Sequence, residues 1–235
     1  MSRGFDRLAW CYAGLERLAF GSRLQVCRTA SLDVLDSPCR VLVLGEGDGR
    51  FVAALRRRWP GAEVLVVDAS AAMVARARRR LADADALDRV TFFVADALEV
   101  EFDAGSFDVV VANFFVDCFD PATQARVLDR IEGWMAPGGT LLLGEFVPAR
   151  SRRARMWQCL LARPMHAFFR AAAGISARAL QDIPAALRAR GLVATSVTEM
   201  CGGFLQASVW CRASVSEPHA EPNPEEQRAV AACEQ

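Results

Sequence analysis

Three glycines at alternate positions, Gly45, Gly47 and Gly49, follow a short apolar run at 41–44. Glycine lets a backbone turn sharply and approach a ligand closely, where a Cβ atom would collide with it. The same loop precedes an expected helix, so a ligand bound there would lie near the helix N-terminus. A glycine loop between a strand and a helix is more informative than one elsewhere, and we interpret it as a cofactor-binding loop.

The spacing of these glycines separates two cofactor classes. A dinucleotide-binding fingerprint requires G-x-G-x-x-G, or alanine at its last position. Counting from Gly45 places Arg50 at that position, and counting from Gly47 places Val52 there. The observed G-x-G-x-G pattern therefore argues against a nicotinamide cofactor.

Polar residues follow three further apolar runs. Asp68 ends the run at 63–67 and stands 23 residues after Gly45, close to the ~20 residues expected for an acid that binds ribose hydroxyls. Asp96 follows the run at 90–94, and Asn113 follows the run at 107–112. These runs are expected to be parallel strands, whose carboxyl ends meet at one edge of a sheet, where ligands bind.

Helical segments alternate with these runs and must position their ends. The pattern predicts helices at 51–59 and 69–84, and a third from the N-cap Asp120 to about 135. A fifth strand is expected at 140–146. Two closing strands, 192–198 and 204–210, are separated by a short glycine turn and should be antiparallel. The expected fold class is α/β, a doubly wound, mostly parallel seven-stranded sheet with an antiparallel last strand.

Together the ordered strand ends resemble class I S-adenosylmethionine-dependent methyltransferases, and the small-molecule ubiquinone and menaquinone group in particular. The stretch Asp68-Ala69-Ser70-Ala71-Ala72-Met73 is similar to that family's D-x-S-x-x-M pattern, and Pro137-Gly138-Gly139 is also typical of it. The resemblance implies a Rossmann-like methyltransferase fold and S-adenosyl-L-methionine as cofactor. It assigns cofactor contacts to Gly45, Glu46, Gly47, Gly49, Asp68, Ala69, Met73, Asp96, Ala97, Asn113 and Phe114. One departure is Val43, where the family often has an acid; we hypothesise that Glu46 contacts the cofactor's amino group instead.

The implied reaction is methyl transfer by in-line attack, which needs alignment and exclusion of water more than covalent catalysis. A general base is required only if the acceptor must lose a proton, and His166 is the candidate because its ordinary pKa of about 6.5 suits that task. Other side chains that can line an acceptor pocket are more often structural; they are Tyr12, Asp117, Glu145, Trp157 and Arg170. The segment 147–174 resembles the lid of small-molecule methyltransferases and suggests a small, partly apolar acceptor.

Composition excludes several classes of protein. The 28 basic and 28 acidic residues cancel, so the basic surplus of a nucleic-acid binder is lacking. No apolar run reaches the ~18 residues of a membrane span, although the arginines at 150–155 allow peripheral contact with an anionic surface. The first residues are unlike a secretory leader, and we expect a cytoplasmic location. The eight cysteines form no C-x-x-C pair, so no metal site is expected.

We expect three parts in this chain: an N-terminal helical segment covering the active site (1–37), a methyltransferase domain (38–212) and a disordered tail (213–235). Two other functions stay open. The chain can be a catalytically inactive S-adenosylmethionine-binding regulatory partner, because binding motifs do not prove turnover. A nicotinamide-dependent oxidoreductase is disfavoured by the glycine spacing and by the lack of any lysine for a Tyr-x-x-x-Lys pair.

Overall fold

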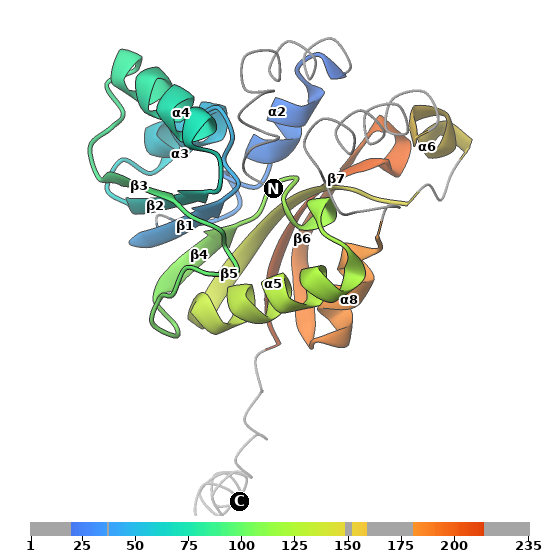
Figure 1. Ribbon diagram of the computed structural model, residues 1–235. Helices are drawn as coiled ribbons and strands as arrows, with labels where there is room; N and C mark the ends of the chain where they lie inside the picture. Colours follow the sequence, from blue (N-terminus) through green and yellow to red (C-terminus); the bar gives the residue numbers. More distant parts are fainter. Residues whose placement is uncertain (1–19, 37, 149–151, 159–180, 214–235) are drawn as a thin grey trace, which may run out of the picture.

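A computed structural model describes residues 20–36, 38–148, 152–158 and 181–213 (Figure 1). The helix α2 (Arg23–Thr29) comes first. The alternating part then runs β1 (Arg40–Leu44), α3 (Arg50–Arg58), β2 (Glu63–Asp68), α4 (Ala71–Asp83), β3 (Val90–Val94), β4 (Phe107–Val111), η1 (Val116–Cys118), α5 (Pro121–Trp134) and β5 (Met135–Phe146). After α6 (Arg152–Trp157) come α8 (Ile183–Ala189), β6 (Leu192–Met200), η3 (Cys201–Gly203) and β7 (Leu205–Arg212).

The described strands form one seven-stranded sheet in the order β3-β2-β1-β4-β5-β7-β6. The pairs β1–β2, β1–β4, β2–β3 and β4–β5 are parallel. β7 lies antiparallel between β5 and β6. The expected fold class, including the antiparallel last strand, is therefore confirmed. The order reverses at β1 and β4, so the loops after these two strands lie side by side at the switch point where ligands bind in such sheets.

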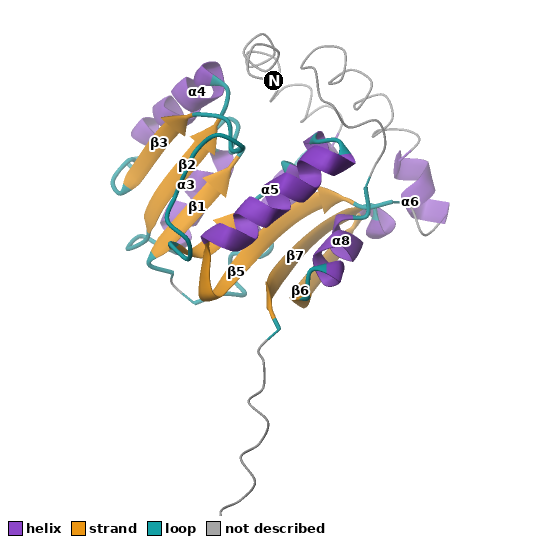
Figure 2. Cartoon of the chain, turned by 60° about the horizontal axis from the view of Figure 1, so that its bottom comes forward, coloured by secondary structure: helices purple, strands orange, loops and turns teal. Residues whose placement is uncertain are grey.

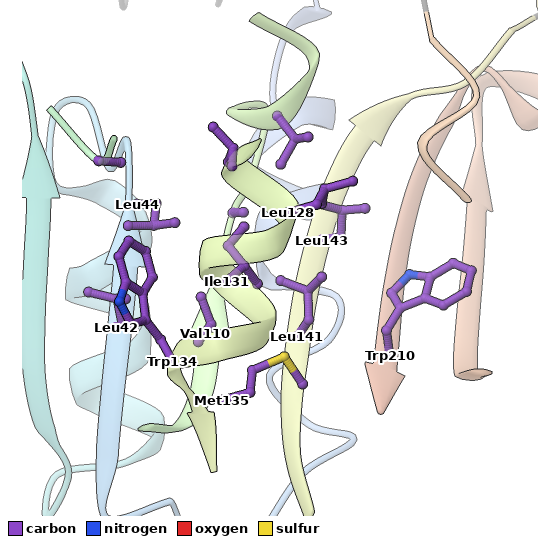
Figure 3. Close-up of a cluster of buried hydrophobic side chains, with 14 of the residues drawn as sticks. Leu42, Leu44, Val110, Leu128, Ile131, Trp134, Met135, Leu141, Leu143 and Trp210 are labelled. Carbon is purple, nitrogen blue, oxygen red and sulfur yellow. The ribbon is translucent and has the colours of Figure 1, made fainter. Parts of the chain in front are cut away.

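Helices cover both faces of the sheet (Figures 1 and 2). On one face α3 and α4 pack on the central strands, and the buried core there includes Phe51, Leu55 and Trp59. On the other face α5 packs on β4 and β5 and α8 packs on β6, and Ile131 and Trp134 of α5 are buried against the sheet (Figure 3). Both faces are thus apolar, which explains why the strands are continuous apolar runs rather than alternating ones.

Two helix starts show how local sequence sets the element boundaries. Asp120 caps α5, because its Oδ1 accepts from the backbone N–H groups of Ala122 and Thr123 at 3.1 Å each. Pro121 follows at the first helical position, where no N–H is needed. Asp182 caps α8 in the same way through the N–H of Ala185. The expected helix ends are met within two residues for α3, α4 and α5.

One strand begins earlier than the sequence predicts. β5 begins at Met135, not at 140, because Met135 already pairs with Phe107 before the register shifts at a bulge. The Pro137-Gly138-Gly139 segment is thus built into an irregular strand. The last described helix, α8, begins at Ile183 and has Pro184 in its first turn. Among the described residues, no helix is long and apolar enough to cross a membrane.

Candidate active site

The loop after β1 has the backbone geometry that its glycines predict. Gly45, Gly47 and Gly49 have φ values of +62°, +74° and +87°, a region that other residues rarely adopt. A Cβ atom added to Gly45 would lie 2.4 Å from Cδ2 of Phe115, and one added to Gly49 would lie 2.8 Å from Cα of Ala77. A Cβ at Gly47 would meet nothing within 4 Å. Gly45 and Gly49 are therefore needed for packing, whereas Gly47 faces open space.

Asp68 at the end of β2 contacts this loop directly. Its Oδ2 accepts from the backbone N–H of Gly47 at 3.1 Å, and its Oδ1 accepts from Ser70 at 2.8 Å. The carboxylate is half-buried and is held by two backbone groups of adjacent loops. The structure thus brings the two strongest sequence signals, the glycine loop and the acid after the second strand, into one site.

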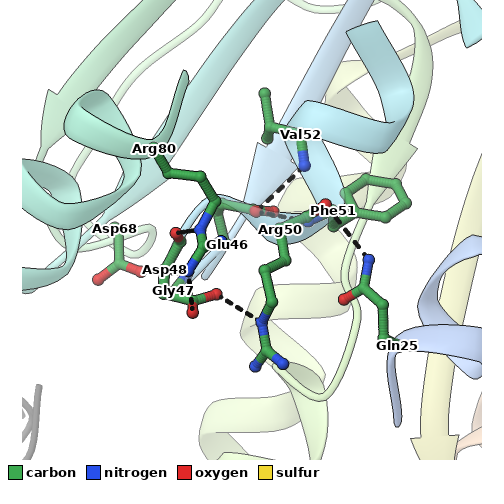
Figure 4. A network of polar contacts seen from close by, with 9 residues as sticks. All are labelled: Gln25, Glu46, Gly47, Asp48, Arg50, Phe51, Val52, Asp68 and Arg80. Atoms are coloured by element: carbon green, nitrogen blue, oxygen red, sulfur yellow. Dashed lines mark hydrogen bonds and ion pairs between the residues drawn. The ribbon is translucent and has the colours of Figure 1, made fainter. Parts of the chain in front are cut away.

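Glu46 has a structural contact that the sequence analysis missed. Its Oε1 accepts from the backbone N–H groups of Phe51 and Val52, at 3.0 and 3.1 Å, and so caps the first turn of α3 (Figure 4). Burial raises the pKa of Glu46 to about 8, although these N–H groups and the charge of Arg28 act to lower it. The contact with the cofactor's amino group stays a prediction, and one carboxylate oxygen already serves the helix.

Asp48, also unassigned from the sequence, fixes the loop against its neighbours. Its side chain is buried, accepts from Nε of Arg50 at 3.0 Å and pairs with Arg80 at 3.2 Å. Arg80 belongs to α4 and also donates to the backbone carbonyl of Asp48. Gln25 of α2 donates to the carbonyl of Arg50 (Figure 4). These contacts join α2, α3 and α4 around the glycine loop and make it rigid.

The next predicted contacts border the same edge of the sheet. Oδ1 of Asp96 accepts from the N–H of Leu98, which folds the loop after β3 back on itself. Ala97 is buried, and Ala69 is half-buried beside Asp68. Met73 is buried in the first turn of α4, where its N–H donates to Oγ of the N-cap Ser70. These residues follow β2 and β3 at the carboxyl edge, as the sequence predicted.

The segment after β4 completes this edge with strained backbone and aromatic rings. Phe114 has a φ of +52°, and its N–H donates to the carbonyl of Gly144 on β5. Its ring packs 5.0 Å from that of Phe146 and lies under the guanidinium of Arg28 at 5.2 Å. Nδ2 of Asn113 is buried and has no hydrogen-bond partner among the described residues. An unpartnered buried donor is costly unless a ligand completes it.

Two buried acids lie beside this segment. Glu145, near the end of β5, has an exposed fraction of 1%, and neither carboxyl oxygen has a hydrogen-bond partner in the described part of the chain. Asp117 in η1 is also buried, and burial raises its pKa to about 6. Burial, together with the charges of Asp117 and Asp182, raises the pKa of Glu145 well above its usual range. The sequence analysis named both acids as side chains that can line an acceptor pocket and favoured a structural role for them.

Several predicted residues lie outside the described residues or have undescribed side chains. His166, Tyr12 and Arg170 are outside, and Trp157 ends α6 with a side chain that is not described. Within the described ranges, no group of three or more His, Cys, Asp or Glu side chains is arranged to hold a metal ion. The glycine loop, Asp68, Asp96 and Asn113 are the predicted residues that the fold brings to one edge.

Known proteins resemble this chain in the region that carries the site. Residues 41–139 match the family model described as a methyltransferase domain. A demethylmenaquinone methyltransferase of Thermus thermophilus is 39% identical over 146 residues, which cover 61% of this chain and 64% of the relative. A carboxy-S-adenosyl-L-methionine synthase of Geobacter metallireducens is 39% identical over 105 residues, covering 43% and 42%.

Solved structures share the fold at lower identity. An O-methyltransferase family protein of Burkholderia thailandensis superposes with a TM-score of 0.62 at 22% identity, over 82% of this chain and 56% of that one. The chain therefore spans about two fifths to two thirds of the length of these three proteins. The strand order and the family match agree: residues 41–139 match a methyltransferase domain, and the sheet has the fold of the O-methyltransferase family protein.

Proposed function

We propose that this protein transfers a methyl group from S-adenosylmethionine to a small, partly apolar acceptor. The observation that carries the proposal is the hydrogen bond between Asp68 and Gly47. It places a ribose-type acid against a glycine loop with the G-x-G-x-G spacing of the family, at the switch point of the sheet. The demethylmenaquinone methyltransferase relative supports an acceptor with an apolar ring system.

The residues at this edge fit the cofactor. Gly47 faces open space, so the backbone can approach a ligand there without a Cβ atom in the way. Asp68 offers a carboxylate to the ribose hydroxyls, and Asn113 offers an unpartnered amide donor. Met73 and Ala97 supply apolar surface next to Asp68 and Asp96, in the positions that the family resemblance gives to the adenine. When bound, the cofactor supplies an electrophilic methyl group.

The chain's own contribution is to hold and orient the reactants. The contacts of Asp48 with Arg50 and Arg80 fix the loop before any ligand binds. Less conformational entropy is therefore lost on binding. The rings of Phe114 and Phe146 form an apolar wall after β4 and β5 that excludes water. The predicted roles of the 1–37 segment and of the 147–174 lid belong to this proposal. The role of His166 as a base stays a prediction from the sequence, because His166 lies outside the described residues.

Calorimetric titration tests the cofactor. We expect S-adenosylmethionine to bind and NAD to give no heat of binding. The variant Asp68→Asn is compared with Asp88→Asn. Because Asp88 is exposed, the second variant shows the effect on binding of losing a carboxylate at the surface. Preferential binding of NAD would instead support the oxidoreductase alternative.

A product screen tests the reaction. The protein, S-adenosylmethionine and panels of phenols, quinols and carboxylic acids are incubated, and each product is examined by mass spectrometry for the added methyl group. Binding of S-adenosylmethionine without a methylated product in any panel would favour the inactive regulatory partner.

A further inference from the structure

Glu145 is a buried acid without a structural explanation in the described part of the chain. Buried carboxyl groups of folded proteins are normally hydrogen-bonded or paired, because burial without a partner is energetically costly. Neither oxygen of Glu145 has a hydrogen-bond partner among the residues that the structure describes, and its exposed fraction is 1%. The described charged groups that act on it are both acids, Asp117 and Asp182.

The position of Glu145 connects it to the cofactor edge. Its neighbour Gly144 accepts from Phe114, the predicted cofactor residue after β4. Asp117 lies close enough to Glu145 to raise its pKa, and the Cys118 thiol is 3.8 Å from Oδ1 of Asp117. Asp68 in turn acts on that thiol and raises its pKa. Asp68 and Glu145 therefore interact electrostatically with two residues, Cys118 and Asp117, that contact each other.

The groups packed around Glu145 leave its carboxyl oxygens for a ligand. On β7 its backbone partner is Gln206, and on α2 the Cys27 thiol bonds the Glu145 backbone rather than its side chain. Asp117 of η1 and Asp182, the N-cap of α8, complete the titratable groups that face it among the described elements. An acid surrounded by acids and apolar side chains can accept a proton, and it favours a partner that brings an O–H group.

Resting on the proposed function, we propose that Glu145 is the general base of the reaction and that the acceptor carries an acidic hydroxyl group, as a phenol or an enol does. A carboxyl oxygen of Glu145 receives the hydroxyl proton. The electron pair of the acceptor then forms the bond to the methyl carbon, and the carbon–sulfur bond breaks with its pair left on sulfur, giving the neutral thioether. Glu145 returns the proton to water afterwards. This assigns to Glu145 the role that the sequence analysis gave to His166.

A chromophoric phenol tests this proposal without turnover. The complete protein is saturated with S-adenosylhomocysteine and titrated with 4-nitrophenol, whose phenol and phenolate forms absorb at different wavelengths. We expect the wild type to bind the phenolate form at a pH where the free compound is largely protonated. The variant Glu145→Gln should bind the compound as the neutral phenol, whereas the control Glu63→Gln, an exposed glutamate at the start of β2, should behave as the wild type.

Turnover and a second variant make the test complete. With the acceptor found in the product screen, Glu145→Gln should lower kcat at least about 100-fold, the usual contribution of a general base. Asp117→Asn should still ionise 4-nitrophenol, but with the midpoint shifted to lower pH, because a neighbouring negative charge is removed. This variant keeps the proposal testable if Glu145→Gln fails to fold.

The failures are distinguishable. An equal phenolate fraction in wild type and Glu145→Gln, no binding of 4-nitrophenol, or an acceptor without an ionisable hydroxyl would each overturn the inference, while calorimetric binding of S-adenosylmethionine leaves the proposed function intact. Absence of S-adenosylmethionine binding in the wild type would overturn the proposed function itself.

Discussion

The acidic side chains on the two sides of the carboxyl edge of the sheet differ in their hydrogen bonding. On the glycine-loop side, Glu46, Asp48 and Asp68 all accept hydrogen bonds from backbone N–H groups or arginines of the chain. On the β5 side, Glu145 is more deeply buried and has no such partner among the described residues. The first side is complete before a ligand binds, whereas the second keeps bonding capacity for one. Rigid cofactor binding is thus proposed after β1 and β2, and acceptor chemistry at the end of β5, on the other side of β4.

The largest expected effect on stability comes from a substitution in the glycine loop. Gly49→Ala should lower the free energy of unfolding by about 3 kcal/mol or more. It forces alanine into a left-handed backbone conformation, which costs ~1–2 kcal/mol, and it places a Cβ atom 2.8 Å from the Cα of Ala77. Urea unfolding monitored by circular dichroism measures it. Gly61→Ala is the control, because an added Cβ there meets nothing within 4 Å. A loss below 1 kcal/mol would mean that the loop is not held against α4.

The second prediction concerns the acidic side and its dependence on pH. The pKa of Asp117 is raised to about 6 in the folded protein, above its ordinary value near 4. Between these values the folded state binds more protons at Asp117, so the contribution of Asp117 to stability falls as pH rises through this window and is level above it. Asp117→Asn should remove this contribution, worth up to about 3 kcal/mol, and leave the part of the slope that comes from Glu46 and Glu145. Urea unfolding of the ligand-free protein from about pH 4 to about pH 7 shows it; an unchanged slope would contradict the burial of this acid.

A smaller effect is expected for the acid that joins the loop to the cofactor. Asp68→Asn should weaken S-adenosylmethionine binding by about 10- to 100-fold, the value of a charged hydrogen bond lost to a ligand. Calorimetry gives the dissociation constants. If Asp68→Asn bound as tightly as the exposed control Asp88→Asn, Asp68 would serve only the backbone of the loop.

The smallest effect on stability is expected at Gly47. Gly47→Ala should cost only about 1–2 kcal/mol of unfolding free energy, since its Cβ meets no atom within 4 Å. The same methyl group would occupy the open space in which the cofactor is proposed to lie, so affinity should fall more than stability. The dissociation constant and the free energy of unfolding of Gly47→Ala are compared with those of Gly49→Ala. The comparison distinguishes a glycine needed for cofactor binding from one needed for packing.

The parts of the site that the sequence predicted are those encoded locally. The glycine loop, Asp68 and Asp96 each follow an apolar run directly, so strand ends and spacing were enough to place them. Asp120 was recognised as an N-cap for the same reason. The mostly parallel sheet and its antiparallel last strand followed from the alternation of elements and from the closing hairpin.

The missed features depend on contacts between distant segments. Three contacts join residues far apart in the chain, and no local pattern predicts them. They are the guanidinium of Arg28 on the ring of Phe114 and the hydrogen bonds from Arg80 to Asp48 and from Gln25 to Arg50. Glu46 was read as a ligand contact, although it caps α3 from outside the usual capping spacing. Glu145 was underrated because only the packed structure shows that its oxygens lack partners.

The placement of β7 also bears on how the chain matures during synthesis. The residues proposed to bind the cofactor lie between 45 and 114, and the strands β1 to β4, at 40–111, pair with one another. β5, by contrast, stays an edge strand until Leu205–Arg212 has been made and inserts between it and β6. Until then its apolar residues and unpaired backbone groups are exposed to wrong strand pairing. The cofactor side can therefore assemble first, and early ligand binding would stabilise a nascent chain whose acceptor wall is still incomplete.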